Sequence, residues 1–193
     1  MVSTADSRVL GSRAGAVTPA VAVAASVGLA VALAAAAQLR IPLPFTPVPL
    51  TLQTFVLCLG AAWLGPRLAA SGLGLYVGAA LVGLPVLSGL RGGLAAFTGA
   101  TGGYVVGWFL AAVVMGRLLA PERAAGWSRT VLAMALGSVI ILFTGTLHLA
   151  LLLGLSAPQA LLMGVAPFLP GDALKVLAAA ALVRRWPDPL ALC

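Results

Sequence analysis

Six apolar stretches recur along the chain, and short segments rich in proline, glycine or arginine separate them. The stretches cover residues 18–38, 51–64, 68–83, 103–119, 130–154 and 172–185. About 20 consecutive apolar residues are enough for a helix to cross a hydrocarbon core of roughly 30 Å. The pattern therefore predicts an all-α membrane protein that folds as a six-transmembrane-helix bundle. We expect a single transmembrane domain over residues 1–193, in which residues 1–17 form an N-terminal tail.

The first apolar stretch must be distinguished from a secretory signal peptide, because Arg8 and Arg13 precede it. The apolar core of a signal peptide has about 7–15 residues. The stretch here is longer, and further apolar stretches follow it. We therefore expect the first helix to be retained as a membrane span.

The composition agrees with a membrane location. Hydrophobic residues make up 62% of the chain and charged residues 8%, whereas soluble domains are about 45–50% apolar. The formal net charge of +7 would raise the question of nucleic-acid binding in a soluble domain. Here the basic residues stand singly between apolar stretches and form no clustered basic face. Nucleic acid is therefore not an expected partner.

The distribution of the basic residues predicts the orientation in the membrane, because positive residues accumulate in cytoplasmic loops. The side shared by the N-terminus and the even-numbered loops would carry Arg8, Arg13, Arg67, Arg117, Arg123, Arg129, Arg184 and Arg185. The opposite side would carry only Arg40, Arg91 and Lys175. Both termini are therefore expected in the cytoplasm, with residues 1–17 as a cytoplasmic tail of a multi-pass plasma-membrane protein.

An acid and a base stand together in the last apolar stretch. Asp172 and Lys175 have i, i+3 spacing in LPGDALK, residues 169–175, which places them on one face of a helix. Each costs roughly 2.5–3.5 kcal/mol at the centre of a membrane helix, and an ion pair alone seldom offsets that cost. A structural pair, or a Lys175 side chain that reaches the interface, is the simpler alternative. Because Arg91 is expected on the same side, with Arg40 as a candidate third cation, we favour a site for a small anionic ligand.

Two loops on this outer side have unusual compositions. Residues 41–50, IPLPFTPVPL, contain four prolines, which exclude a helix and favour an extended path. Residues 83–103 are rich in glycine and apolar, and irregular backbone at membrane depth is tolerated only where it is buried in protein or lines a cavity. Both loops are therefore predicted to form walls or a lid of a pocket.

Small residues repeat at three- or four-residue spacing in several stretches. They are Ala30, Ala34 and Ala37, then Gly74 and Gly78, then Gly103 and Gly107. Such spacing lets helix backbones approach closely. Packing within the chain is one explanation, and docking of a partner membrane protein is the other.

Other candidate chemistry is weaker. His148 and Ser156 lie near each other in the sequence, so an intramembrane serine hydrolase is an alternative function, although nothing specifies the oxyanion donors that it needs. No P-loop motif occurs, and two cysteines, Cys58 and Cys193, have no metal-ligand spacing. Tyr104 and Trp108 fit pocket aromatics or interfacial anchors equally well. We expect no enzymatic activity and no metal site.

Five segments of the chain resemble the BioY family in order and spacing. They are TPVPLTLQT (46–54), LGPR (64–67), YVGAALVGLPVLSG (76–89), TGGYVVGW (101–108) and PFLPGDALK (167–175). Members of this family are the biotin-specific, substrate-binding S components of energy-coupling factor (ECF) transporters. The resemblance implies a six-helix bundle that captures biotin with high affinity from outside and works with a transmembrane coupling protein and ABC-type ATPases. ATP would then be hydrolysed by the partner subunits, with no cofactor on this chain.

The resemblance also implies a set of functional residues. Arg91, Asp172 and Lys175 match the family's pocket charges, and the proline loop with Pro44, Phe45, Pro47 and Pro49 matches its lid. Ala30, Ala34 and Ala37 match its docking surface for the coupling protein. We expect biotin's ureido group on Asp172 and its carboxylate on a base, although the two ends could be swapped. Some relatives use an asparagine, which this chain lacks, so one polar contact would come from Gln53, Tyr76 or Thr101. Tyr104 is also expected among the substrate-binding residues. A solitary biotin facilitator is a further alternative.

Overall fold

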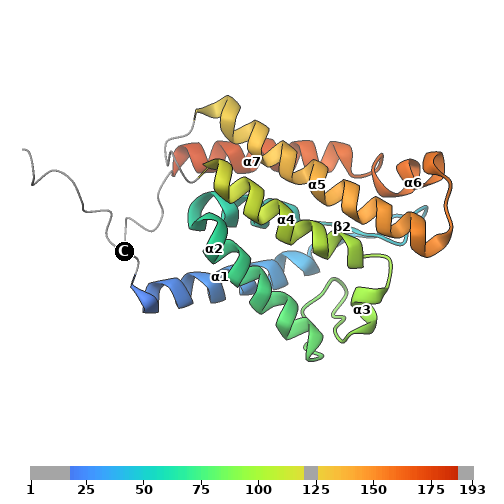
Figure 1. Cartoon of the computed structure of the whole chain (residues 1–193), viewed down its shortest axis with the longest axis horizontal. Coiled ribbons are helices and arrows are strands. Elements are labelled where there is room, and N and C mark those ends of the chain that lie inside the picture. The colour runs from blue at the N-terminus through green and yellow to red at the C-terminus, as the bar shows by residue number, and fades with distance from the viewer. Residues whose placement is uncertain (1–17, 120–125, 187–193) are drawn as a thin grey trace, which may run out of the picture.

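The computed structural model describes residues 18–119 and 126–186, which form an all-helical bundle with one small hairpin (Figure 1). The helices are α1 (Pro19–Gln38), α2 (Gln53–Leu81), α3 (Ala95–Thr98), α4 (Gly102–Leu119), α5 (Trp127–Leu153), α6 (Ala157–Gly164) and α7 (Leu169–Arg185). The strands are β1 (Arg40–Ile41) and β2 (Leu50–Thr51). The predicted tail and the basic residues Arg8, Arg13 and Arg123 lie outside the described residues.

Within the described ranges, four helices are long and apolar enough to cross a membrane: α1, α2, α4 and α5. The pair α6 and α7, bent by 47° at its break, adds a fifth candidate span. The protein is therefore a multi-pass membrane protein. The count differs from the six predicted stretches because α2 contains two of them, residues 51–64 and 68–83.

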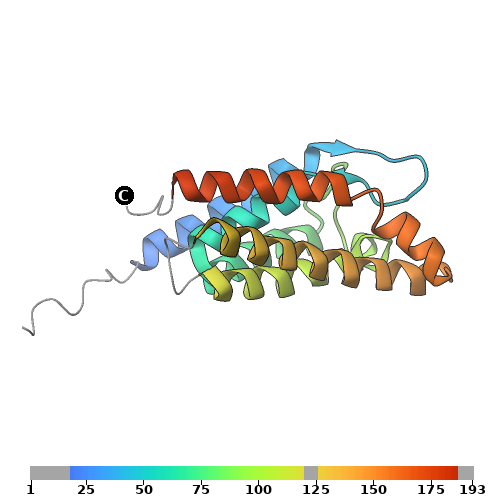
Figure 2. The same cartoon turned by 90° about the horizontal axis from the view of Figure 1, so that it is seen from above.

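Helix α2 is interrupted at Gly65, whose φ of 74° and ψ of 177° are not helical. Glycine adopts a positive φ readily, and the following Pro66 cannot donate a helical hydrogen bond. A continuous helix would separate Gln53 from Tyr76 by about 34 Å. Their side chains are hydrogen-bonded at 2.9 Å, so the chain must reverse at the break, as Figures 1 and 2 show.

Close packing at glycines joins the helices. Leu29 of α1 lies against both Gly60 and Gly72, one in each half of α2. Gly103 and Gly107 of α4 lie against α5, as their spacing predicted. Packing within the chain does not account for Gly74 and Gly78, because no atom lies within 4 Å of a Cβ built at either position; the other alternative, docking of a partner, stays a prediction for this pair.

These environments predict opposite effects of adding one methyl group. In Gly107→Ala the new Cβ would lie 2.8 Å from the Ile141 Cα, and such overpacking costs about 1–3 kcal/mol. In Gly74→Ala the methyl group enters open space, and alanine favours a helix by about 1 kcal/mol over glycine. Thermal unfolding in detergent should show a lower midpoint for Gly107→Ala and an equal or higher one for Gly74→Ala. Equal midpoints would contradict this packing of α4 on α5.

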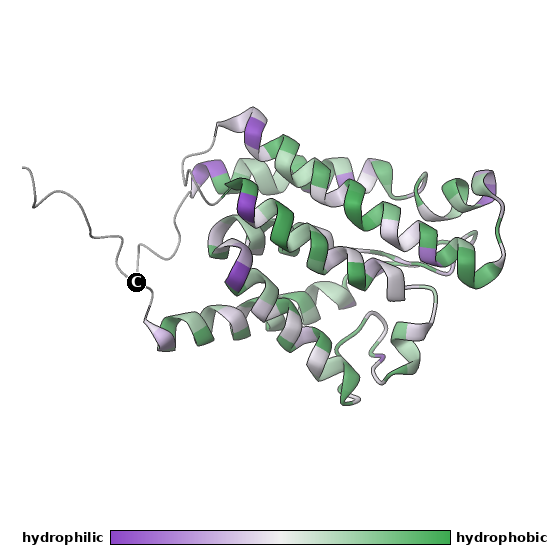
Figure 3. Cartoon of the chain, in the orientation of Figure 1, coloured by the Kyte–Doolittle hydropathy of each residue, from purple (hydrophilic) through white to green (hydrophobic). Residues whose placement is uncertain are grey.

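Many of the strongly hydrophilic positions lie at one end of the bundle, where α4 ends and α5 begins (Figure 3). Arg117 lies in the last turn of α4, and Arg184 and Arg185 lie in the last turn of α7. The Trp63 indole N–H donates to the Trp186 carbonyl at 2.8 Å, which fastens the end of α7 near the break in α2. The ends of the helices that carry these arginines therefore lie together.

The opposite end carries the irregular segments. Strands β1 and β2 pair in antiparallel register, Arg40 with Thr51 and Ile41 with Leu50, and they close the proline-rich loop 42–49. Leu50 also lies against Gly171 in the first turn of α7. The hairpin is thereby fixed beside the acid and base that begin α7.

Candidate ligand-binding site

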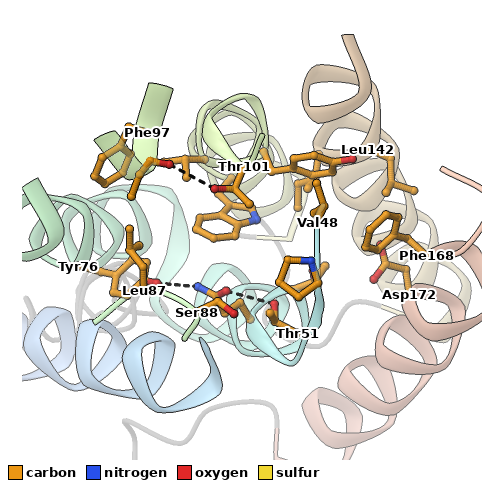
Figure 4. Close-up of a pocket in the computed structure, with 18 of the residues that line it drawn as sticks. Val48, Thr51, Tyr76, Leu87, Ser88, Phe97, Thr101, Leu142, Phe168 and Asp172 are labelled. Carbon is orange, nitrogen blue, oxygen red and sulfur yellow. Dashed lines mark hydrogen bonds between the residues drawn. The ribbon is translucent and has the colours of Figure 1, made fainter. Parts of the chain in front are cut away.

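A pocket opens among α2, α4, α5, α7 and the two unusual loops (Figure 4). The space between its walls, counted together with the open solvent at its mouth, is about 750 Å³. All seven residues predicted to bind substrate line it: Gln53, Tyr76, Arg91, Thr101, Tyr104, Asp172 and Lys175. The structure therefore brings together residues from positions 53 to 175 of the chain.

The acid and base of α7 form an ion pair on the pocket wall. The Lys175 ammonium lies 2.9 Å from a carboxylate oxygen of Asp172. Their side chains are only 11% and 8% exposed, respectively. Asp172 lies in the first turn of α7, where the positive end of the helix dipole favours an anion. The pair is neutral as a unit, and each partner keeps hydrogen-bonding capacity for a ligand.

Arg91 reaches the pocket from the glycine-rich loop. It ends a tight turn in which Leu87 and Arg91 exchange backbone hydrogen bonds of 2.9 and 3.4 Å. Its Nε–H donates to the Ser88 carbonyl at 3.1 Å. Arg40, a possible third pocket cation, instead packs its guanidinium against Gly89 and does not line the pocket. The pocket charges are thus two cations and one anion, a net charge of +1.

The neutral polar residues predicted for the site already have partners. Thr51 donates to the Gln53 side chain at 3.1 Å, and Gln53 donates to the Tyr76 hydroxyl at 2.9 Å, a chain of bonds that is dashed in Figure 4. The Thr101 hydroxyl donates to the Ala96 carbonyl at 3.3 Å. The Tyr104 hydroxyl donates to the Gly164 carbonyl at 3.0 Å, which braces the break between α6 and α7. A ligand would meet their remaining acceptor or donor capacity.

Ser88 was missed by the sequence analysis. Its side chain lines the pocket, and its buried hydroxyl oxygen has no hydrogen-bond partner among the described residues. Buried polar groups are nearly always paired, so an unpaired one on a pocket wall marks a contact that a ligand can complete. A serine within a glycine-rich loop carries no pattern that would single it out.

Apolar and aromatic side chains form the remaining walls. Trp108 lies 6.3 Å from Tyr76, centroid to centroid, and Phe168 lies 6.1 Å from Tyr104. Figure 4 shows Phe168, Leu142 and Asp172 on one side of the pocket and Phe97 and Leu87 on the other. Trp108 is thus a pocket aromatic, the first of its two alternatives. The walls suit a hydrocarbon body and the few charges suit its polar ends.

The predicted lid lies partly over the pocket. Pro49 lines the pocket. Val48 also lines it, although the sequence analysis did not name this residue. Val48 and Thr46 are both buried. Pro44, Phe45 and Pro47 are exposed on the outer side of the hairpin. Their part in a lid stays a prediction.

The remaining candidates lie away from the pocket lining. Ala37 is fully buried, and Ala30 and Ala34 pack partly against the core. Packing within the chain therefore accounts for much of this face of α1. Docking of a partner there stays a prediction.

The two residues of the hydrolase alternative make other contacts. The His148 ring lies 3.1 Å from the Gly99 carbonyl. Ser156 precedes α6 and bonds with Gln159. Both contacts are those of structural residues.

Comparison with known proteins decides the family. The BioY family model matches residues 7–191. The chain belongs to the BioY family. Among curated members, the Biotin transporter BioY of Rhizobium etli is 38% identical over 147 residues, which are 72% of this chain and 78% of that protein. The Biotin transporter BioY of Lactococcus lactis is 30% identical over 145 residues, 73% of this chain and 76% of that protein.

A solved structure shares the fold of this BioY family member. It is described as the S-component for biotin from an ECF-type ABC transporter, and it superposes with a TM-score of 0.80 at 28% sequence identity. The match covers 85% of this chain and 89% of that one. The bundle described above is therefore the S-component fold.

Proposed function

We propose that this chain is the biotin-binding S component of an ATP-driven ECF-type importer, which captures biotin from the outer side with high affinity. The observation that carries the proposal is the pocket in which Arg91, Asp172 and Lys175 meet beneath the proline hairpin. Membership of the BioY family supports the same function, because its curated members are named biotin transporters.

Biotin has the chemistry that this pocket complements: a carboxylate, a ureido group with two N–H donors and an apolar ring system. Lys175 is already neutralised by Asp172, whereas Arg91 has no carboxylate partner among the described residues. We therefore place the carboxylate at Arg91, through charge-assisted hydrogen bonds. The ureido donors then face the free lone pairs of Asp172.

The topology that we propose has six membrane crossings in a single substrate-binding domain, with both termini in the cytoplasm. The reversal at Gly65 supports it, because each half of α2 can cross separately. The arginines Arg117, Arg184 and Arg185, at the end opposite the pocket, support a cytoplasmic location for that end. The pocket would then open outward from the plasma membrane.

Transport in this proposal depends on partner subunits, a transmembrane coupling protein and ABC-type ATPases, which would hydrolyse the ATP. The chain itself would bind no cofactor. The exposed side of α1 next to Ala30 and Ala34 is the proposed docking surface. The alternative of a solitary facilitator predicts biotin uptake by proteoliposomes that contain this chain alone, which the S-component proposal does not.

The alternative of an intramembrane hydrolase is not favoured. The curated relatives with similar sequences are named biotin transporters. The solved structure with the same fold is described as an S-component of a transporter. His148 and Ser156 are absent from the pocket lining and make structural contacts. We therefore propose no catalytic residue for this chain.

Equilibrium binding of labelled biotin to the purified full-length chain in detergent tests the proposal. We expect saturable binding of one biotin per chain, and competition by biotin analogues that keep the carboxylate and the ureido ring. The absence of binding to the folded chain would contradict the proposed function.

Ser88→Ala tests the unpaired hydroxyl. We expect biotin affinity to fall about threefold to tenfold, since one hydrogen bond contributes a net 0.5–1.5 kcal/mol or so. Thermal stability should not fall, because the hydroxyl has no partner to lose in the free protein. Ser138→Ala is the matched control, since its buried hydroxyl is also unpaired but does not line the pocket. Equal affinities of the two variants for biotin would contradict a ligand contact at Ser88.

A further inference from the structure

Gln38, the last residue of α1, makes an unusual set of contacts across the chain. Its amide nitrogen lies 3.3 Å from the Val86 carbonyl and 3.2 Å from the Leu87 carbonyl. Its amide oxygen accepts from the backbone N–H of Leu90 at 3.3 Å. One side chain of α1 thus binds three backbone groups of a loop about fifty positions away in the sequence.

The loop bound by Gln38 contains the turn that carries Ser88 and Arg91. The Leu90 N–H can only donate and the two carbonyls can only accept, so only one orientation of the Gln38 amide bonds with all three groups. The same nitrogen also lies 3.2 Å from the Ala34 carbonyl of its own helix, so its two hydrogens are shared among three acceptors. Gln38 therefore acts as a two-sided clamp. It fixes the beginning of the turn through the two carbonyls, and its far side through the Leu90 N–H.

The clamped turn has a backbone that its sequence does not favour. Gly89 has a φ of 77° and Leu90 a φ of 57°. Glycine adopts such values readily, whereas leucine rarely does, because its Cβ is crowded there. The Leu90 side chain is 68% exposed, so burial of this side chain does not compensate for the strain. The hydrogen bond from Leu90 to Gln38 is a contact that favours the strained conformation directly.

We propose that Gln38 is a positioning residue for the ligand site: it holds the 87–91 turn so that Arg91 faces the pocket. It does not line the pocket itself. The inference rests on the proposed role of Arg91 in binding biotin. It also assigns a link between α1 and the site, because a change at the end of α1 would alter the position of the turn.

The test is biotin affinity of the full-length chain in four forms: wild type, Gln38→Ala, Arg91→Ala and the double variant. We expect Gln38→Ala to bind about tenfold more weakly, the result if the turn then adopts its binding conformation roughly a tenth of the time. In the Arg91→Ala background the same change should cost about threefold or less, because only the contact of Ser88 on the same turn then remains to be lost, and the effects of two residues that act through one another are not additive. Leu39→Ala, an exposed neighbour, is the control and should bind like wild type.

A second variant keeps the test decisive if Arg91→Ala binds too weakly to measure. Glycine at position 90 adopts the positive φ without strain, so Gln38→Ala with Leu90→Gly should regain most of the lost affinity. A general loss of stability would not be repaired in this way. No recovery, wild-type affinity in Gln38→Ala, or equal losses with and without Arg91 would each overturn the inference. Unchanged affinity in Arg91→Ala alone would also overturn it, because Arg91 would then not contact biotin, whereas only the absence of biotin binding in the wild type would contradict the proposed function.

Discussion

Asp172→Asn is expected to weaken biotin binding by about 100-fold or more. The variant removes the anion that would accept from the ureido group, and it leaves Lys175 without its partner at 2.9 Å. Each hydrogen bond to a charged group contributes about 1.5–3 kcal/mol, the ureido group has two N–H donors, and each 1.4 kcal/mol or so is a factor of ten. Equilibrium binding of labelled biotin measures the effect.

The same variant is also expected to lower stability, because an unpaired buried charge is costly. A double variant, Asp172→Asn with Lys175→Gln, separates the two effects because it removes both charges together. Its thermal unfolding midpoint should recover toward that of the wild type, while biotin binding stays lost. If the double variant bound biotin like the wild type, the pair would have a structural role only. Leu174→Ala, at an exposed position of the same helix outside the pocket lining, serves as the control.

Arg91→Ala is expected to give the second largest effect, a loss of biotin affinity of about 10- to 100-fold. The guanidinium is the pocket cation without a carboxylate partner in the described part of the chain. Hydrogen bonds to a charged group contribute about 1.5–3 kcal/mol. Because Arg91 is exposed at the mouth, its removal should leave the unfolding midpoint nearly unchanged. Competition with biotin amides, which lack the carboxylate charge, should show a much smaller loss.

Arg40→Ala is the matched comparison for Arg91→Ala. Both arginines belong to the minority of basic residues expected on the outer side, but Arg40 lies against Gly89 and does not line the pocket. We expect its affinity for biotin to change less than about threefold. Equal losses in the two variants would indicate a general effect of positive charge at the mouth, such as attraction of an anionic ligand.

Much of the site was predictable because its signals are local. Asp172 and Lys175 are neighbours on one helix turn, so their i, i+3 spacing was enough to pair them. The two halves of α2 were predicted as separate apolar stretches, and the reversal between them agrees with Gly65 and Pro66. Arg91 was singled out by counting charges, since it belongs to the minority of basic residues expected on the outer side.

Other features depend on which segments pack together, and no local pattern reports that. Ser88 became a candidate only when its hydroxyl was found buried and unpaired on the pocket wall. Tyr104 lines the pocket as expected, yet its hydroxyl is bound to Gly164, sixty positions away. Arg40 was a possible pocket cation by position, and packing against Gly89 directs it elsewhere.

The sequence by itself determined that this protein is a helical membrane protein of the BioY family. It also determined that Arg91, Asp172 and Lys175 are candidates for one shared site. Hydrophobic length, charge asymmetry and residue spacing act over one span or one turn, so they can be read along the chain. Only the tertiary structure decided that Gln38 clamps the turn carrying Arg91, and that Ser88 faces the pocket unpaired. The contacts of Gln38 join groups about fifty residues apart, and they, like the burial of Ser88, exist only after the helices have packed.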